Sequence, residues 1–462
     1  MNHYLLNSEK NRINILLDAI ENNLYQINTL FLKEQFTNLI RDNKDASIED
    51  ILNNLLENLN KEMTPLLDNN LTLGTQFGIK NNYFEIESYG GYYLSKNNLY
   101  NINIDTLFSF DSISKIITSI ITMYQVRNKI FTLDTTISQY NNNYNLDAPI
   151  KSILKFTAHI KTKQRIDNLS KEETISLLKE CKENLIDKQQ YKNYYKYNDI
   201  GYMILRQIIP NFLSELDSLL LNIDNKNLTY KNKVSNITGG KIGEENITPD
   251  PKGREITFPG HTGLYGNITG LLNLFSKITE TSSILTEEEK NILLKQPYQD
   301  PIVYNLDGTP KIARSNNPEY ITKVAGLFRM PYGTKPPYNK PTDFNVSNST
   351  TRNVKASAGT CGSWVTNDNL SFENMFGSYT AGILTNPYSF VENKKYPNKI
   401  NKLPNTPLEV NEKGVIINYL KTLNKYKEIL TNYAILLELI TEYIKQEHKE
   451  QLLPKKLVKK II

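Results

Sequence analysis

The stretch "FSFDSISKIITSIITMYQV" (residues 108–126) places Ser112 and Lys115 three positions apart at the start of an apolar run. Residues i and i+3 share one face of a helix, so a helix that begins near Asp111 brings the two side chains together. A serine hydroxyl becomes a good nucleophile only when a neighbouring base takes its proton, and a lysine can act as that base only where burial lowers its pKa. The apolar flanks predict such burial. A capped helix with a solvated lysine is the other interpretation of the pair taken alone.

The composition indicates a globular protein without a broad charged surface. With 462 residues, the chain is long enough for a large core and two lobes. A hydrophobic fraction of 39% and a charged fraction of 22% are typical of soluble folded proteins. The net charge of +5 is spread over 54 basic and 49 acidic residues, which argues against nucleic acid as a partner.

Cysteine and histidine usage limits the chemistry further. Cys181 and Cys361 lie far apart in the sequence, so we expect no disulfide framework and a reducing compartment. Four histidines provide partners for neither a zinc cluster nor a Ser-His-Asp triad, so no metal and no cofactor are predicted. The first residues lack the apolar run of a secretory signal, and no stretch approaches the roughly 18 apolar residues of a membrane span. We therefore expect a cytoplasmic protein.

The order of the predicted elements indicates an α+β fold. Residues 1–70 have helical periodicity and are predicted to form an N-terminal helical extension. An alternating stretch around Asn81 and Asn82 predicts a β-hairpin, and two further strands and a long helix follow near the C-terminal end. This order predicts an antiparallel sheet that is flanked by helices and closed by both ends of the chain. The basic tail, residues 451–462, is interpreted as a frayed and solvated terminus. Contact of its four lysines with an anionic membrane surface is the alternative.

The first motif lies within "LFSFDSISKIITSIITMYQVRNKIFTLDTTISQY" (residues 107–140), which resembles the active-site helix of the serine β-lactamase and penicillin-binding-protein superfamily, in its class C β-lactamase-like branch. The resemblance implies a β-lactamase/DD-peptidase-like domain over residues 71–450, with a helical subdomain inserted at about 130–290. The next segment departs from the family pattern, because Phe156, Ala158 and His159 replace its usual histidine and Ser-Gly pair.

The second family motif is Tyr-x-Asn or Tyr-x-Asp, followed by a Gly-Tyr pair and a helix. The segment "YYKYNDIGYMILRQII" matches it with Tyr197, Asp199, Gly201 and Tyr202. The resemblance implies that the phenol of Tyr197 shuttles a proton near the lysine, a role that typically contributes about 10²- to 10⁴-fold. It also implies that Asp199 orients Lys115 or the substrate amide. A surface tyrosine is the alternative for Tyr197 alone, because the chain has 29 tyrosines.

The third family motif is Lys-Thr-Gly or His-Thr-Gly on the strand that borders the site. The literal match, His261-Thr262-Gly263, precedes a capped helix, so we interpret it as a loop near the cleft, with a direct contact of His261 as the lesser alternative. The better match is "KASAGTCGSWVTNDN" (residues 355–369), where Ser357 stands in place of the cation and Gly359 is the motif glycine. The resemblance implies an oxyanion hole built from the backbone N–H groups of Ser112 and Thr360.

Together the motifs imply a serine hydrolase that cleaves an amide or ester bond through a Ser112 acyl-enzyme, with proton transfer by Lys115 and Tyr197. We expect a small-molecule or peptide substrate. Superfamily members include β-lactamases, D-Ala-D-Ala carboxypeptidases, esterases and D-amino-acid peptidases, so the fold alone does not fix the substrate. Two alternatives stay open: a catalytically silent module that only binds, and a partner-binding role for the first 70 residues. The oligomeric state is left open.

Overall fold

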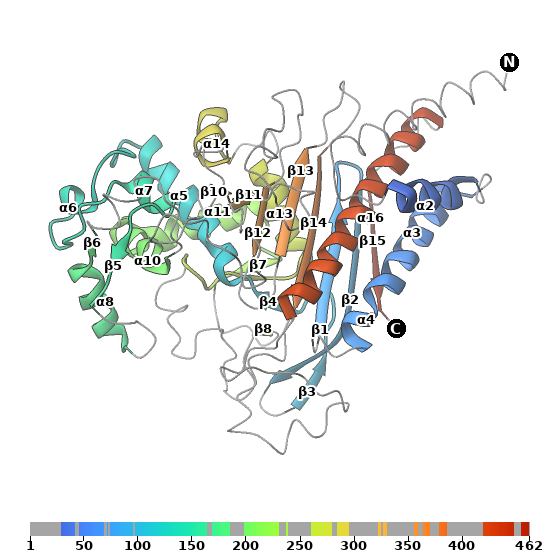
Figure 1. Cartoon of the computed structure of the whole chain (residues 1–462), viewed down its shortest axis with the longest axis horizontal. Helices are drawn as coiled ribbons and strands as arrows, with labels where there is room; N and C mark the ends of the chain where they lie inside the picture. The colour runs from blue at the N-terminus through green and yellow to red at the C-terminus, as the bar shows by residue number, and fades with distance from the viewer. Residues whose placement is uncertain are drawn as a thin grey trace, which may run out of the picture.

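A large antiparallel sheet forms the centre of the molecule (Figure 1). The computed structural model describes residues 29–41, 46–68, 72, 74–95, 98–163, 169–184, 198–230, 237–238, 260–279, 284–294, 322–324, 327–329, 355–358, 364–369, 378–385, 419–447 and 454–461. Within these residues the strand order is β10 (Thr322–Val324), β11 (Leu327–Arg329), β12 (Lys355–Ala358), β13 (Trp364–Asn369), β14 (Ser378–Thr385), β1 (Gly74–Lys80), β2 (Phe84–Ser95) and β15 (Lys455–Lys460), and β3 (Asn98–Asn101) pairs with β2.

The sheet is joined by both halves of the chain, because β1 lies between β2 and β14. Thr75 is paired with Thr385, and on the other side Lys80 is paired with Glu85, both in antiparallel register. The Oδ1 atom of Asn81 accepts hydrogen bonds from the backbone N–H of Tyr83 (2.9 Å) and of Phe84 (2.8 Å), which fixes the turn between β1 and β2. The predicted hairpin and the closure of the sheet by both chain ends are therefore confirmed.

One face of the sheet is covered by helices from the two ends of the chain (Figure 1). These helices are α2 (Thr29–Arg41), α3 (Ile48–Met63), the short α4 (Pro65–Asp68) and α16 (Tyr419–Glu447). Ser47 begins α3 with a capping box, in which Ser47 and Asp50 satisfy each other's backbone N–H groups. Leu55 of α3, Leu436 of α16 and Phe77 of β1 belong to one buried cluster. The described N-terminal helices therefore share the core of the sheet.

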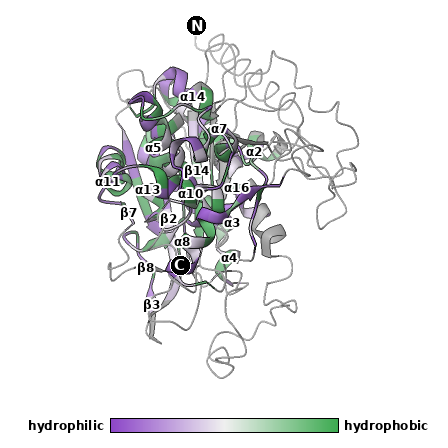
Figure 2. Ribbon diagram, turned by 90° about the vertical axis from the view of Figure 1, so that its left-hand side faces the viewer, coloured by the Kyte–Doolittle hydropathy of each residue, from purple (hydrophilic) through white to green (hydrophobic). Residues whose placement is uncertain are grey.

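The opposite face of the sheet packs against α13 (Ile268–Thr279) and then against a helical lobe. Hydropathy colouring shows α13 as largely apolar (Figure 2), and its Leu271, Leu272 and Phe275 are buried. The other helices of this side are α5 (Lys115–Arg127), α6 (Ile137–Tyr140), α7 (Ile150–Leu154), α8 (Lys171–Glu180), α10 (Asp199–Ile208), α11 (Phe212–Ile223) and α14 (Glu287–Leu294). Short strands accompany them: β4 (Leu107–Ser109), β5 (Ile160–Lys161), β6 (Lys182–Glu183), β7 (Leu228–Thr229), β8 (Ile237–Thr238) and β9 (Tyr265–Gly266). The predicted α+β fold, an antiparallel sheet flanked by helices plus a helical subdomain, is confirmed.

The C-terminal residues do not fray. Residues 455–460 form β15, which pairs in parallel with β2 at the edge of the sheet. The Nζ atom of Lys456 lies 2.9 Å from Oε2 of Glu87, a side chain that is fully buried, and Lys459 donates to Glu57 of α3 at 2.6 Å. The interpretation of these residues as a frayed tail is therefore wrong. The pairing could not be read from the sequence, because the carboxylates that bind these lysines are far away in the chain.

Candidate active site

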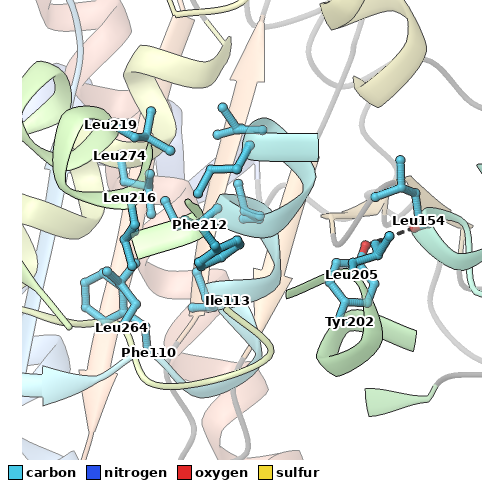
Figure 3. Close-up of a cluster of buried hydrophobic side chains, with 14 of the residues drawn as sticks. Phe110, Ile113, Leu154, Tyr202, Leu205, Phe212, Leu216, Leu219, Leu264 and Leu274 are labelled. Carbon is cyan, nitrogen blue, oxygen red and sulfur yellow. Dashed lines mark hydrogen bonds between the residues drawn. The ribbon is translucent and has the colours of Figure 1, made fainter. Parts of the chain in front are cut away.

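Ser112 lies in a single 3-10 turn, η1 (Asp111–Ser114), that leads directly into α5. The residue before it, Asp111, has a φ of 46°, a left-handed conformation that aspartate adopts more readily than most residues. Phe110, directly before this turn, and Ile113, within it, have fully buried side chains that belong to one core cluster with Leu264 and Phe212 (Figure 3). The apolar residues around the serine therefore hold the turn in a fixed position on the core.

Lys115 is the first residue of α5 and one of the most buried charged groups, with a side chain only 1% exposed. Its Nζ atom donates to Ser112 Oγ at 3.1 Å and to the backbone carbonyl of His261 at 2.8 Å. It also forms an ion pair with Asp199 Oδ1 at 2.6 Å. A hydroxyl, a carbonyl and a carboxylate oxygen can all accept hydrogen bonds from a lysine ammonium. These contacts hold Lys115 Nζ beside the serine oxygen.

The loop of residues 260–264 is bound to the same helix by hydrogen bonds. Thr118 Oγ1 donates to the Gly260 carbonyl at 2.8 Å, and the backbone N–H of Leu264 donates to Ser114 Oγ at 3.0 Å. The backbone N–H of Phe110 donates to the Leu264 carbonyl at 2.8 Å. Because these contacts surround the His261 carbonyl, the loop fixes the acceptor that Lys115 uses.

Asp199 comes from the first turn of α10. The side chain of Asn198 caps this helix by accepting from the backbone N–H of Gly201 at 3.2 Å. Gly201 lies close to α7, where a Cβ atom at this position would be 2.7 Å from Cγ2 of Ile153. The glycine of the Gly-Tyr pair thus permits α10 to approach α7, and this approach brings Asp199 to Lys115.

Tyr202 supports α5, the helix that follows Ser112, from the side. Its hydroxyl donates to the Leu154 carbonyl at 3.0 Å (Figure 3) and lies 3.2 Å from Ser119 Oγ. Ser119 Oγ in turn donates to the backbone carbonyl of Lys115 at 3.0 Å. Phe156 stacks on the Tyr202 ring with centroids 5.1 Å apart, and has a φ of 60°. The segment that departs from the family pattern therefore still packs beneath the site.

The third motif is described in part. Strand β12 carries Ser357, which is paired with Val365 of β13, and this strand lies against η1. The structure thus brings the strand of the third motif next to the turn that carries Ser112. Tyr197, Gly359 and Thr360 lie outside the described residues, so their roles stay predictions.

Sequence reasoning treated the His261 loop as structure near the cleft and missed that its main chain binds Lys115. A backbone carbonyl leaves no residue-type signal; the spacing of glycines in "FPGHTGLYG" was the available cue. Burial, followed by the nearby Glu180, raises the pKa of the Cys181 thiol to about 12. Among the described residues no cluster of three or more His, Cys, Asp or Glu side chains is placed to hold a metal. In the same residues, no helix has the length and apolar character needed to span a membrane.

Comparisons with known structures identify the fold. The chain is similar to a class C β-lactamase from Rhodobacter sphaeroides, with 12% identity and a TM-score of 0.51 over 84% of this chain and 99% of that one. It is similar to a D-amino acid amidase from Ochrobactrum anthropi, with 13% identity and a TM-score of 0.52 over 84% and 99% of the two chains. A β-lactamase/D-alanine carboxypeptidase from Yersinia pestis matches with 11% identity and a TM-score of 0.50 over 82% and 98%.

No family model matches the sequence, and neither does any curated protein. The chain has the fold of the serine β-lactamase and penicillin-binding-protein superfamily. These three structures are of hydrolases.

Proposed function

We propose that this protein is a serine hydrolase that cleaves an ester or amide bond through an acyl-enzyme on Ser112. The observation that carries the proposal is the 3.1 Å contact between the buried ammonium of Lys115 and Ser112 Oγ, at the start of a helix in this fold. A cation at this distance stabilises the serine alkoxide and so makes the hydroxyl a better nucleophile. The hydrolytic activities of structurally similar proteins support the same reaction class.

In the proposed reaction, Ser112 Oγ forms a bond to the substrate carbonyl carbon while its proton moves to the Tyr197 phenolate. Lys115 stays charged in this scheme; it stabilises the phenolate before the transfer and the negative charge that develops on the serine oxygen as the proton leaves. The proton then passes to the leaving amine or alcohol as the bond to the carbonyl carbon breaks. Water attacks the acyl-enzyme by the reverse proton path and restores Ser112. Backbone N–H groups of Ser112 and Thr360 are assigned to the oxyanion, where one donor is typically worth about 2.7–4 kcal/mol.

Esters and amides that carry no carboxylate are the proposed substrates, because Ser357 takes the place of the cation that would bind a substrate carboxylate. A cytoplasmic location and hydrolysis of small molecules or peptides are part of this proposal. The silent binding module remains the rival, motivated by Ser357 and by the altered segment 156–159.

A fluorophosphonate probe tests the proposal directly. We expect stoichiometric labelling of the intact chain, located at Ser112 by peptide mass spectrometry. Ser112→Ala and Lys115→Met should abolish it, while Ser138→Ala, a serine of α6 outside the site, should label like the parent. A folded parent protein that acquires no label, or a label that survives Ser112→Ala, would establish the binding module or another nucleophile instead.

A further inference from the structure

The ion pair beside Ser112 is exposed on one side only. The side chain of Lys115 is 1% exposed, whereas that of Asp199 is 40% exposed. The lysine charge is therefore covered by the protein, whereas part of the Asp199 side chain is accessible to solvent. Within this ion pair, the accessible partner is the negative one.

A carboxylate at this position also restricts hydrogen bonding. An ionised aspartate accepts hydrogen bonds and donates none, whereas an asparagine offers both an acceptor and a donor. A substrate carbonyl that faced residue 199 would meet a like partial charge and no donor. A substrate N–H group, above all an ammonium, would find a charge-assisted acceptor.

The distances match a short acyl group. Asp199 Oδ1 and Ser112 Oγ both contact Lys115 Nζ, at 2.6 and 3.1 Å, so they are within about 6 Å of each other. In an amino acid the amine lies about 2.5 Å from the carbonyl carbon. A charge-assisted hydrogen bond from that amine to a carboxylate adds about 2.8 Å. An α-ammonium bound to Asp199 thus leaves its own carbonyl carbon within reach of Ser112.

We propose that the site selects acyl groups with a free α-ammonium, and that Asp199 binds this group, so that the substrates are esters or amides of unblocked amino acids or N-terminal residues. The proposal rests on the proposed function, because it assigns the acyl group that Ser112 receives. Ser357 agrees with it, since the third motif offers no cation at the usual place for a substrate carboxylate. The covalent steps are unchanged, and the ammonium neither gains nor loses a proton in them.

The test compares three p-nitroanilides that differ only at the α position: alanyl, with a free amine, N-acetylalanyl and propionyl. Both enantiomers of the first two are used. For the parent protein we expect kcat/KM for alanyl p-nitroanilide to exceed that for the other two at least tenfold. The isosteric Asp199→Asn should reduce this ratio at least tenfold. Any general loss of activity from disturbing Lys115 affects all three substrates and cancels in the ratio.

The pH profile of the ratio provides a second readout. The α-amine of an amino acid derivative loses its proton near pH 8, so the preference should fall as the pH rises through the pKa of the substrate amine. In Asp199→Asn the ratio should not vary with pH. Asp134→Asn, which removes an exposed carboxylate that pairs with Lys151, is the matched control and should keep the parent ratio and profile.

The possible outcomes separate the selectivity proposal from the hydrolase proposal. If Ser112 is labelled but the parent hydrolyses the blocked and free substrates equally, the selectivity proposal is wrong and the hydrolase proposal stands. A preference for succinyl p-nitroanilide, which carries a carboxylate, would show that a cation controls the site and would also overturn it. If Ser112 takes no label, both proposals fall together.

Discussion

Replacing Gly260 with alanine tests whether the loop of residues 260–264 is held on α5 as the structure indicates. Gly260 has a φ of 121°, a conformation that residues with a side chain rarely adopt. A Cβ atom there would lie 2.4 Å from Thr118 Oγ1 and 2.8 Å from Cζ of Phe212. Both neighbours are buried, with exposures of 0% and 1%, so neither has solvent to move into.

The expected loss of stability follows from two contributions. Backbone strain of this kind costs about 1–3 kcal/mol, and an extra methyl group in a packed site typically costs about 1–3 kcal/mol. We therefore expect Gly260→Ala to lower the free energy of unfolding by about 4 kcal/mol. Thr118→Ala removes the hydroxyl that donates to the Gly260 carbonyl and should cost about 1–2 kcal/mol.

The double variant is the decisive measurement. Thr118→Ala also removes the Oγ1 atom that a Cβ at residue 260 would meet. The double variant should therefore lose less free energy of unfolding than the sum of the two single variants. We expect a difference of about 1 kcal/mol or more, which is typical of the coupling between residues in contact. Urea unfolding followed by circular dichroism gives the three values. The rate of acylation by the fluorophosphonate probe should also fall at least tenfold in Gly260→Ala, because the His261 carbonyl moves away from Lys115.

Two results would refute this reasoning. One is a stable Gly260→Ala protein, with a loss below about 0.5 kcal/mol, which is the range of surface substitutions. The other is strict additivity in the double variant, which would mean that residues 118 and 260 do not press on each other.

Two further predictions concern the sheet. Burial, together with a hydrogen bond to Glu85, raises the pKa of Glu87 from 4.5 to about 7, so between these values the folded protein holds a proton that the unfolded chain has released. The free energy of unfolding should therefore decrease as pH rises through this window, on the order of 1–3 kcal/mol. Glu87→Gln should flatten the slope of the free energy of unfolding against pH, measured by urea unfolding at a series of pH values. An unchanged slope would contradict the assignment. Leu55→Ala, at a fully buried position of α3, should cost about 2–5 kcal/mol, whereas Leu221→Ala, 66% exposed on α11, should change unfolding by less than about 0.5 kcal/mol.

The local parts of the site can be predicted from the sequence, because they depend on helical spacing. Ser112 and Lys115 lie three residues apart, and the structure has their side-chain atoms in contact. The contact with Asp199 joins residues 84 positions apart in the sequence, and only the resemblance to a known family indicates it. The spacing of apolar residues predicts which face of a helix is buried, but it does not predict which distant segment covers that face.

Other parts carry no signal that sequence reasoning uses. The His261 carbonyl binds Lys115 through the main chain, so any residue type at position 261 would offer the same atom. The C-terminal strand is misread for a different reason. Its four lysines look solvated by composition, yet Lys456 pairs with a glutamate more than 360 positions earlier. Short strands are specified by their partners, and these become known only with the fold.

The position of β1 in the sheet has a consequence for how this protein matures on the ribosome. Strand β1 and its hairpin partner leave the exit tunnel early, but the other neighbour of β1, strand β14, is translated about 300 residues later. At synthesis rates of about 5–20 residues per second, β1 waits on the order of 15–60 s with one hydrogen-bonding edge unpaired. Such an edge is a template for aggregation. The nascent chain is therefore expected to depend on chaperones during translation more than its finished, well-packed sheet suggests.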